Sequence, residues 1–236
     1  MTRNYFISPY IFTRFPAYQR GVVLAYGLHN PPSPPELIDA LRQAEQALCT
    51  QLSPETITSH PRIVSWREAY RSLGVKPSEF RPSVEALARR VLKRDPLPAI
   101  STLVDIGTLA SIQNLMPIGA HAIDHVTGDI GLRLATGAET FEPFGADIVE
   151  HPLPGEVIFA EGDVVLTRRW TWRQAKHTLV VPETTAVEFN VDALPPLTRP
   201  EVEQICQQVA ALIQRYCGGT TRFSILSAAN PSISLD

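Results

Sequence analysis

The side chains best suited to chemistry gather in one short stretch near the middle of the chain. His121, Asp124 and His125 lie within five consecutive positions. An imidazole can position or deprotonate a water molecule, and it also binds divalent metals. If the stretch is helical, His121 and His125 share a face and could hold a metal, with His177 as a distant third ligand. Because no third ligand has a suitable spacing, we expect no metal and no cofactor. His121 then either positions water or belongs to an ordinary polar loop.

A second cluster is the run RRWTWR at residues 168–173. As a strand, this run places Arg169 and Arg173 on one side and Trp170 and Trp172 on the other. Arginine binds phosphate through two parallel hydrogen bonds, and tryptophan stacks on unpaired bases. The alternative is structural: the tryptophans fill the core, which we favour for Trp172, and the arginines are solvated.

Positive side chains also repeat on or beside one expected helix. Arg89 and Lys93 are four residues apart, as are Arg90 and Arg94, and Arg81 precedes them. Residues four apart share a helix face. The spacing indicates either a local basic surface that binds nucleic acid or an ordinary solvated face.

The composition restricts the class of protein. The 236 residues include 21 Lys and Arg against 24 Asp and Glu, for a formal net charge of -3. This balance argues against binding nucleic acid by bulk electrostatics, but it leaves room for a local basic face. The three cysteines do not fit a disulfide framework. The sequence shows no leader peptide and no run approaching the roughly 20 apolar residues of a membrane span, so we expect a cytoplasmic protein.

Hydrophobic patterning and capping signals locate the first half of the expected elements. Strands are expected at residues 5–15 and 21–28. Three helices should follow, at about 36–52, 63–73 and 84–93. Ser33-x-x-Glu36 fits a capping box for the first of them, and Ser83 can cap the third. Pro117 is expected to bend or end the apolar segment that begins at Leu103.

The second half of the chain has a strand-like pattern. From residue 129 onward, Gly and Pro separate the apolar runs GLRLA, EVIFA, DVVLTRRW, HTLVV and AVEFNV. A capping box at Thr198-x-x-Glu201 should open a helix that ends near Tyr216, and TRFSILSA is the last strand. The elements do not alternate as a βαβ series would. We therefore predict an α+β fold with a mainly antiparallel sheet flanked by helices, in a single domain over residues 1–236.

Three stretches of this chain resemble a known family. They are WREAYRSLGVKPSEFRPSVEALARRVLKRDPLPAISTLVDI at 66–106, MPIGAHAIDHVTGDIGLRLATGAETFEPFG at 116–145, and PGEVIFAEGDVVLTRRWTWRQAKHTLVVPETT at 154–185. Together they resemble the editing module, the B3/B4 domain, of the phenylalanyl-tRNA synthetase beta chain, and its free-standing relatives, over about residues 62–190. The resemblance implies a three-layer α+β fold. In the synthetase this module removes tyrosine wrongly attached to the phenylalanine tRNA. The chain has no room for the synthetase's catalytic core, so the resemblance does not imply aminoacylation.

The resemblance also implies positions for a pocket. The family's Thr-Asn pair falls on Gly107 and Thr108, and its histidine falls on Gly119, with His121 two residues further on. A family glutamate falls on Asn190, with Glu188 two residues earlier on the same side of a strand. The expected catalytic residues are His121, Thr108 and Glu188. The expected substrate pocket comprises Gly107, Asn114, Gly119, Asp124 and Asn190.

The function implied by the resemblance is deacylation of mischarged aminoacyl-tRNA in trans, by attack of water on the ester. This reaction needs a positioned water, donors for the developing oxyanion and a selective pocket, but no covalent nucleophile. The expected partner is the charged 3′ end of tRNA. The residues expected to bind tRNA are Arg81, Arg89, Arg90, Lys93, Arg169 and Arg173. The alternative is a non-catalytic module that binds tRNA, another RNA or a small molecule and has kept only the fold.

Overall fold

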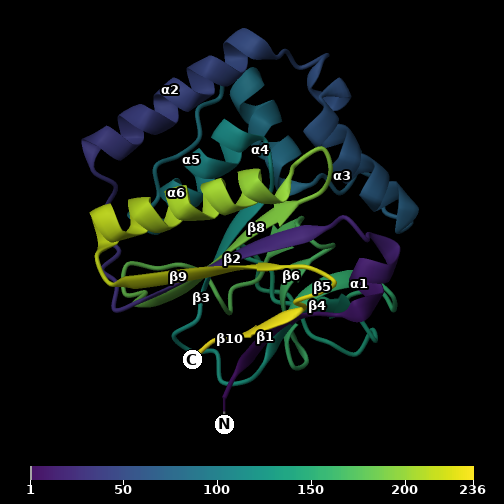
Figure 1. Ribbon diagram of the computed structural model, residues 1–236. Coiled ribbons are helices and arrows are strands. Elements are labelled where there is room, and N and C mark those ends of the chain that lie inside the picture. Colours follow the sequence, from purple (N-terminus) through teal and green to yellow (C-terminus); the bar gives the residue numbers. More distant parts are fainter. Residues whose placement is uncertain (1) are drawn as a thin grey trace.

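The computed structural model describes residues 2–236, and its elements form three layers (Figure 1). Helices cover one face of a four-stranded sheet, and a six-stranded sheet packs against the other face. The α+β class and the mainly antiparallel pairing predicted from the sequence are confirmed. The strands, however, form two stacked sheets instead of one.

The four-stranded sheet is entirely antiparallel and forms the middle layer. Its order is β3 (Ile118–Ala122), β8 (Ala186–Ala193), β2 (Gln19–Tyr26) and β9 (Thr220–Leu226). Successive side chains of a strand point to opposite faces. Val23 and Val191 therefore pack under the helices, whereas Val22 and Leu24 join the core between the two sheets.

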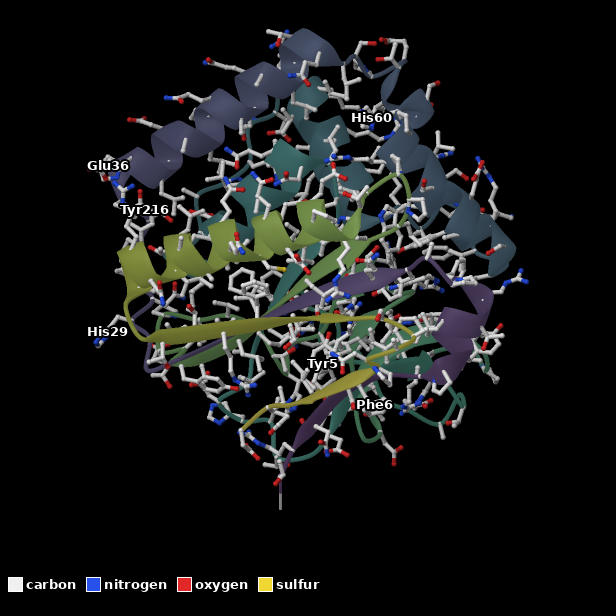
Figure 2. The ribbon with its side chains drawn as sticks, viewed as in Figure 1. Tyr5, Phe6, His29, Glu36, His60 and Tyr216 are labelled. Carbon is white, nitrogen blue, oxygen red and sulfur yellow. The ribbon has the colours of Figure 1, made fainter. Side chains whose placement is uncertain are left out.

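The six-stranded sheet forms the outer layer. Its order is β10 (Ser232–Ser234), β1 (Asn4–Ile7), β4 (Ile130–Leu134), β5 (Val157–Glu161), β6 (Val164–Arg168) and β7 (Arg173–Gln174). Among the strand pairs of this sheet in residues 2–236, only β1–β4 is parallel, and an isolated bridge between Thr140 and Val164 is parallel as well. Tyr5 of β1 is fully buried between the sheets, and Phe6 lies on the outer side of the strand (Figure 2).

Most of the helices lie over the upper face of the middle sheet, whereas the short first helix packs beside β4 of the outer sheet (Figure 1). The helices are α1 (Pro9–Arg14), α2 (Pro35–Gln51), α3 (Pro61–Ser72), α4 (Ser83–Leu92), α5 (Thr102–Asn114) and α6 (Arg199–Cys217), with a 3-10 helix at Ile57–Ser59. The apolar sides of α2, α5 and α6 share one core with β2 and β8. Among residues 2–236, none of these helices combines the length and the apolar composition that a membrane span requires.

Local sequence signals account for some of the helix boundaries but not for others. The capping box predicted at Thr198 is present: its backbone N–H and its hydroxyl both donate to Glu201, at 2.8 and 2.7 Å. The box predicted at Ser33 is wrong. Pro34 occupies the N-cap position of α2, and the Ser33 hydroxyl instead donates to Asp105 of α5 at 2.6 Å.

Two predicted strands are also wrong. The strand expected over residues 5–15 ends at Ile7, because Pro9 takes the first position of α1, where a missing amide has no consequence. The run HTLVV at 177–181 forms turns and irregular structure instead of a strand. There, the hydroxyl of Thr178 and its backbone carbonyl turn toward β3.

The contact between Gly21 of β2 and Cys206 of α6 offers a test of this packing. A Cβ at position 21 would overlap the Cys206 Sγ and press on Val191 and Val202. We expect Gly21→Ala to lower the free energy of unfolding by about 1–3 kcal/mol, because the helix must move away from the sheet. Urea unfolding measures this change.

Two variants serve as controls for that measurement. A Cβ at Gly119 meets no atom within 4 Å, so Gly119→Ala should change stability by less than about 0.5 kcal/mol. Replacing Cys206 by Ala in the Gly21→Ala background should recover much of the loss, because it removes the overlapping sulfur. An unchanged stability of Gly21→Ala would show that α6 does not pack closely on Gly21.

Candidate functional site

A cavity of about 250 Å³ lies between the two sheets. The middle sheet contributes Arg20, Gly119, His121, Asn190 and Asp192 to its wall. The outer sheet and the turn that follows β6 contribute Phe159, Thr167, Trp170, Trp172, Arg173 and Gln174. Ser83, the first residue of α4, borders it as well. The inner residues Arg20, Asn190 and Asp192 are buried, whereas Trp172 and Arg173 are partly exposed and mark the entrance.

The imidazole of His121 is held at both nitrogens. Its Nδ1 lies 2.6 Å from the Thr178 hydroxyl, and its Nε2 lies 3.1 Å from the Thr167 hydroxyl. The side-chain amide of Gln174 is 3.4 Å from Nδ1 and also donates to the Ala120 carbonyl. His121 belongs to the middle sheet, whereas Thr167 and Gln174 belong to the outer sheet, so the ring is fixed where the two layers meet.

The protonation state of His121 follows from its surroundings. Burial, followed by the positive charge of Arg20, lowers the pKa of this imidazole from 6.5 to about 3. At neutral pH the ring is therefore uncharged. A group with so low a pKa is a weak general base, because efficient proton transfer requires a pKa near the working pH. Because both of its nitrogens are engaged, His121 is better suited to hold the Thr167 hydroxyl in position on the cavity wall.

A buried network around Arg20 forms the inner end of the cavity. Arg20 Nε donates to Asp192 Oδ1 at 2.7 Å and to the Tyr18 hydroxyl at 2.8 Å. Its Nη1 donates to the Tyr5 hydroxyl at 2.8 Å, and Tyr18 donates to Asp192. Burial raises the pKa values of Tyr5 and Tyr18 well above 10, so both phenols stay neutral.

Glu188 lies beside this network on β8, directly opposite His121 of β3 in the strand register. The Asn190 side-chain amide donates to Glu188 Oε1 at 3.0 Å, and Glu188 Oε2 has no hydrogen-bond partner in residues 2–236. Burial raises the pKa of the Glu188 carboxyl from 4.5 to about 8. Glu188 is therefore largely protonated at neutral pH.

A strained turn shapes the entrance of the cavity. Arg169 and Trp170 both have left-handed backbones, with φ of 46° and 65°, which is rare for residues with large side chains. This turn inserts Trp170 into the core, where its indole N–H donates to Tyr18 at 3.3 Å. Trp172 then lies at the entrance, with its ring 4.9 Å from that of Phe80. Such strain is commonly found at functional sites.

This turn contradicts the strand expected over 168–173. The strand β6 ends at Arg168, so the alternation of arginines and tryptophans does not occur. The guanidinium of Arg169 stacks 3.6 Å from the Phe80 ring centre and 4.6 Å from that of Trp172. Arg169 thus supports the wall of the entrance, whereas Arg173 lines the cavity itself, with 37% of its side chain exposed.

Comparison with known proteins now assigns the family. A family model described as the B3/4 domain matches residues 65–218. The chain belongs to the B3/4 domain family. Its structure is similar to an N-terminal fragment of the phenylalanyl-tRNA synthetase beta subunit from Pyrococcus horikoshii, with 10% sequence identity and a TM-score of 0.45. That match covers 92% of this chain and 50% of the fragment, so the chain spans about half its length. A comparison with curated proteins finds no match.

Within this B3/4 domain, only some of the predicted pocket residues meet. The cavity brings together His121, Gly119 and Asn190, with Glu188 behind them. Gly107 and Thr108 do not reach it, because α5 lies on the opposite face of the middle sheet. A Cβ on Gly107 would touch the Phe189 ring, in the core under the helices.

The two remaining predicted pocket residues have structural contacts elsewhere. The Asn114 side chain donates to the Ala110 carbonyl at the end of α5. Asp124 is exposed and accepts hydrogen bonds from the backbone N–H groups of Thr185 and Ala186. Neither residue lines the cavity. Asn114 lies at the end of α5, on the helix side of the middle sheet, and Asp124 lies where the chain has turned away after β3.

The histidines predicted as a possible metal pair also lie apart. Residues 118–122 form β3, not a helix, and His125 follows on an exposed turn. His177 lies 2.9 Å from Glu161. Within residues 2–236, no group of three or more His, Cys, Asp or Glu side chains could hold a metal ion.

The basic residues near α4 fall into two groups. Arg89 pairs at 2.8 Å with the fully buried Glu85, and Arg90 pairs at 2.9 Å with Asp95. Arg81 and Lys93 are exposed, and neither makes a salt bridge with any of residues 2–236. The helix begins at the edge of the cavity, where the Ser83 N–H donates to the Thr171 carbonyl at 3.0 Å.

Several residues of the cavity were missed in the sequence. Arg20, Asp192, Thr167 and Gln174 have no motif of their own. One signal was available: β8 carries Glu188, Asn190 and Asp192 at every second position of an otherwise apolar strand. Three buried polar side chains on one face require a polar environment opposite them.

The protonation of Glu188 predicts a dependence of stability on pH. Its pKa is 4.5 in the unfolded chain and about 8 in the folded protein. Between pH 4.5 and about pH 8 the folded state binds one more proton at Glu188 than the unfolded state does. The stability that this proton contributes is therefore complete below pH 4.5 and is lost as the pH rises through about 8. For this single group, the free energy of unfolding changes by at most about 1.4 kcal/mol per pH unit.

Urea unfolding of the wild type and Glu188→Gln from about pH 5 to pH 8 measures this contribution. The glutamine cannot ionise, so stability of the variant relative to wild type should increase with pH. Glu183→Gln, at an exposed position, is the matched control and should track the wild type. Parallel curves for the wild type and Glu188→Gln would contradict a protonated Glu188.

Proposed function

We propose that this B3/4 domain is a trans-editing hydrolase that deacylates mischarged aminoacyl-tRNA in the cavity between its two sheets. The observation that supports the proposal is the cavity itself, which has the size of one amino acid and carries polar groups from three strands at its inner end. The substrate class follows from the three stretches that resemble the synthetase editing module. We expect the protein to act in the cytoplasm, with tRNA as its partner.

The proposed reaction is direct attack of water on the ester. The Thr167 hydroxyl is suited to orient the water, because a hydroxyl keeps further hydrogen-bonding capacity while His121 Nε2, 3.1 Å away on the cavity wall, holds it in position. A thiol nucleophile is disfavoured. Burial raises the pKa of Cys206 to about 12 and that of Cys217 to about 11, and both lie on α6, on the other side of the middle sheet.

Donors for the oxyanion are available at the edge of the middle sheet. β3 is an edge strand, and the Ala122 N–H points outward to the Thr178 carbonyl. Because backbone groups of a strand alternate in direction, the N–H groups of Ala120 and Ile118 also point outward. Ile118 borders the cavity, so its outward N–H group is suited to stabilise negative charge that develops there.

The entrance is suited to the 3′ end of an RNA. Trp172 is partly exposed and backed by Phe80 and Arg169, which form a rigid surface on which a base can stack. Arg173 lies beside it and can contact a phosphate. Arg81 and Lys93 lie just before and just after α4, and because both are exposed they can extend this positive surface.

A deacylation assay with a panel of mischarged tRNAs tests the proposal. We expect loss of the ester on at least one pair well above the spontaneous rate. His121→Ala should reduce that rate about 100-fold or more, because the Thr167 hydroxyl that orients the water loses the ring that holds it in position. Thr108→Val is the matched control, since Thr108 lies away from the cavity, and it should retain wild-type activity. No hydrolysis of any pair would refute the proposal.

Binding of tRNA provides a second test. Arg81→Glu with Lys93→Glu should weaken the complex several-fold. The slope of log affinity against log salt should fall by about 0.9 for each phosphate that the variant no longer neutralises. Arg215→Glu, at the exposed C-terminal end of α6, is the matched control and should bind as the wild type does. Equal affinities for all three proteins in filter binding would contradict this interface.

The second candidate function is binding without catalysis. The low pKa of His121 and the engagement of both its nitrogens favour it, because such a ring contributes little to proton transfer. A tight complex with tRNA that does not depend on charging, together with no hydrolysis, would support this candidate instead.

A further inference from the structure

The guanidinium of Arg20 is buried but not fully bonded. Only 1% of the side chain is exposed, yet the residue lines the cavity. Its Nε and Nη1 donate to Asp192, Tyr18 and Tyr5, whereas no hydrogen bond within residues 2–236 uses Nη2. Arginine carries five N–H donors, and buried donors are normally satisfied. The Nη2 amino group is thus the part of Arg20 left for a ligand.

Asp192 also has a side-chain atom without a hydrogen-bond partner in residues 2–236. Both of its side-chain hydrogen bonds, from Arg20 and Tyr18, go to Oδ1. Oδ2 has no partner in residues 2–236, and Asp192 also lines the cavity. The ion pair therefore offers one donor and one acceptor to the same space.

The rest of the inner wall is uncharged or apolar. The rings of Phe159 and Trp170 border the cavity, and the Phe159 ring lies 5.3 Å from the Arg20 guanidinium carbon. His121 and Asn190 are polar groups without charge under neutral conditions. Since Arg20 and Asp192 neutralise each other, a ligand with a net charge at this end would have no counter-charge left to pair with.

We propose that Arg20 and Asp192 are the specificity-determining residues of the cavity, and that they recognise an uncharged side chain carrying both a hydrogen-bond acceptor and a donor. A hydroxyl or a carboxamide meets this requirement, because it accepts from Arg20 Nη2 and donates to Asp192 Oδ2. The inference rests on the proposed function and adds to it the class of aminoacyl group that is removed. A site built to hydrogen-bond a substrate group discriminates strongly against an analogue that lacks the group, because its own polar atoms then remain unpaired.

Calorimetric titration of the wild-type protein with amino acid α-amides tests this specificity without any hydrolysable ester. Threonine against valine and tyrosine against phenylalanine are near-isosteric pairs that differ in the hydroxyl, and glutamine against glutamate adds a charge. We expect the uncharged polar member of at least one pair to bind about tenfold or more tightly than its partner. Equal or tighter binding of the apolar or charged members throughout would overturn the inference.

The variant Asp192→Asn is expected to reverse the ligand preference of the cavity. It removes the negative charge and replaces the open acceptor by an amide donor, so Arg20 and Asn can together bind a carboxylate. The preference between the α-amides of glutamine and glutamate should then invert in favour of glutamate. Thr108→Val is the control and should keep the wild-type preference, and circular dichroism checks that each variant is folded. A folded Asp192→Asn that keeps the wild-type order would also overturn the inference, and if this variant does not fold, the wild-type titrations decide.

The titrations test the specificity of the cavity, and the deacylation assay tests the hydrolase activity, so either proposal can fail without the other. Hydrolysis of mischarged tRNA with no preference for a polar aminoacyl group would retain the deacylase and reject the specificity. Selective binding of the polar α-amides with no hydrolysis of any ester would retain the specificity and reject the deacylase.

Discussion

The ion pair between Arg20 and Asp192 is the interaction on which the two-sheet arrangement depends. The two groups lie 2.7 Å apart with 1% and 4% of their side chains exposed. Removing one partner of a buried pair typically destabilises a protein by about 3–5 kcal/mol, because the other charge is left unpaired. Arg20 and Asp192 are also direct partners in the β2–β8 register. A slip of one residue would move one of the two charges to the helix side of the sheet and separate the pair, so the pair helps to fix the register.

The same pair connects the layers and sets the chemistry between them. Tyr5 of the outer sheet accepts from Arg20 and donates to Asn190 of the middle sheet. Trp170, inserted by the strained turn after β6, donates to Tyr18 of the same network. The positive charge of Arg20 also contributes to the low pKa of His121. The contacts that stabilise the interface therefore also keep the imidazole neutral.

Elements with strong local signals could be predicted from the sequence. The apolar face of α2 and the capping box of α6 are set by residues within a few positions of one another. Predictions failed where a distant contact competes with a local preference. Ser33 bonds Asp105 instead of capping its own helix, and the run HTLVV turns toward β3 instead of forming a strand.

The sequence by itself determined the α+β class, most of the elements and the family resemblance, and it pointed to three of the residues that line the cavity, Gly119, His121 and Asn190. Tertiary structure decided which polar side chains meet. Thr108 is close to His121 in the sequence, but the middle sheet separates them, whereas Arg20 and Asp192 are 172 positions apart and touch. The spacing of hydrophobic residues indicates which face of a helix or strand is buried, but it does not indicate which other element covers that face. A cavity between two sheets arises only from how the layers stack, so its members could not be named from local patterns.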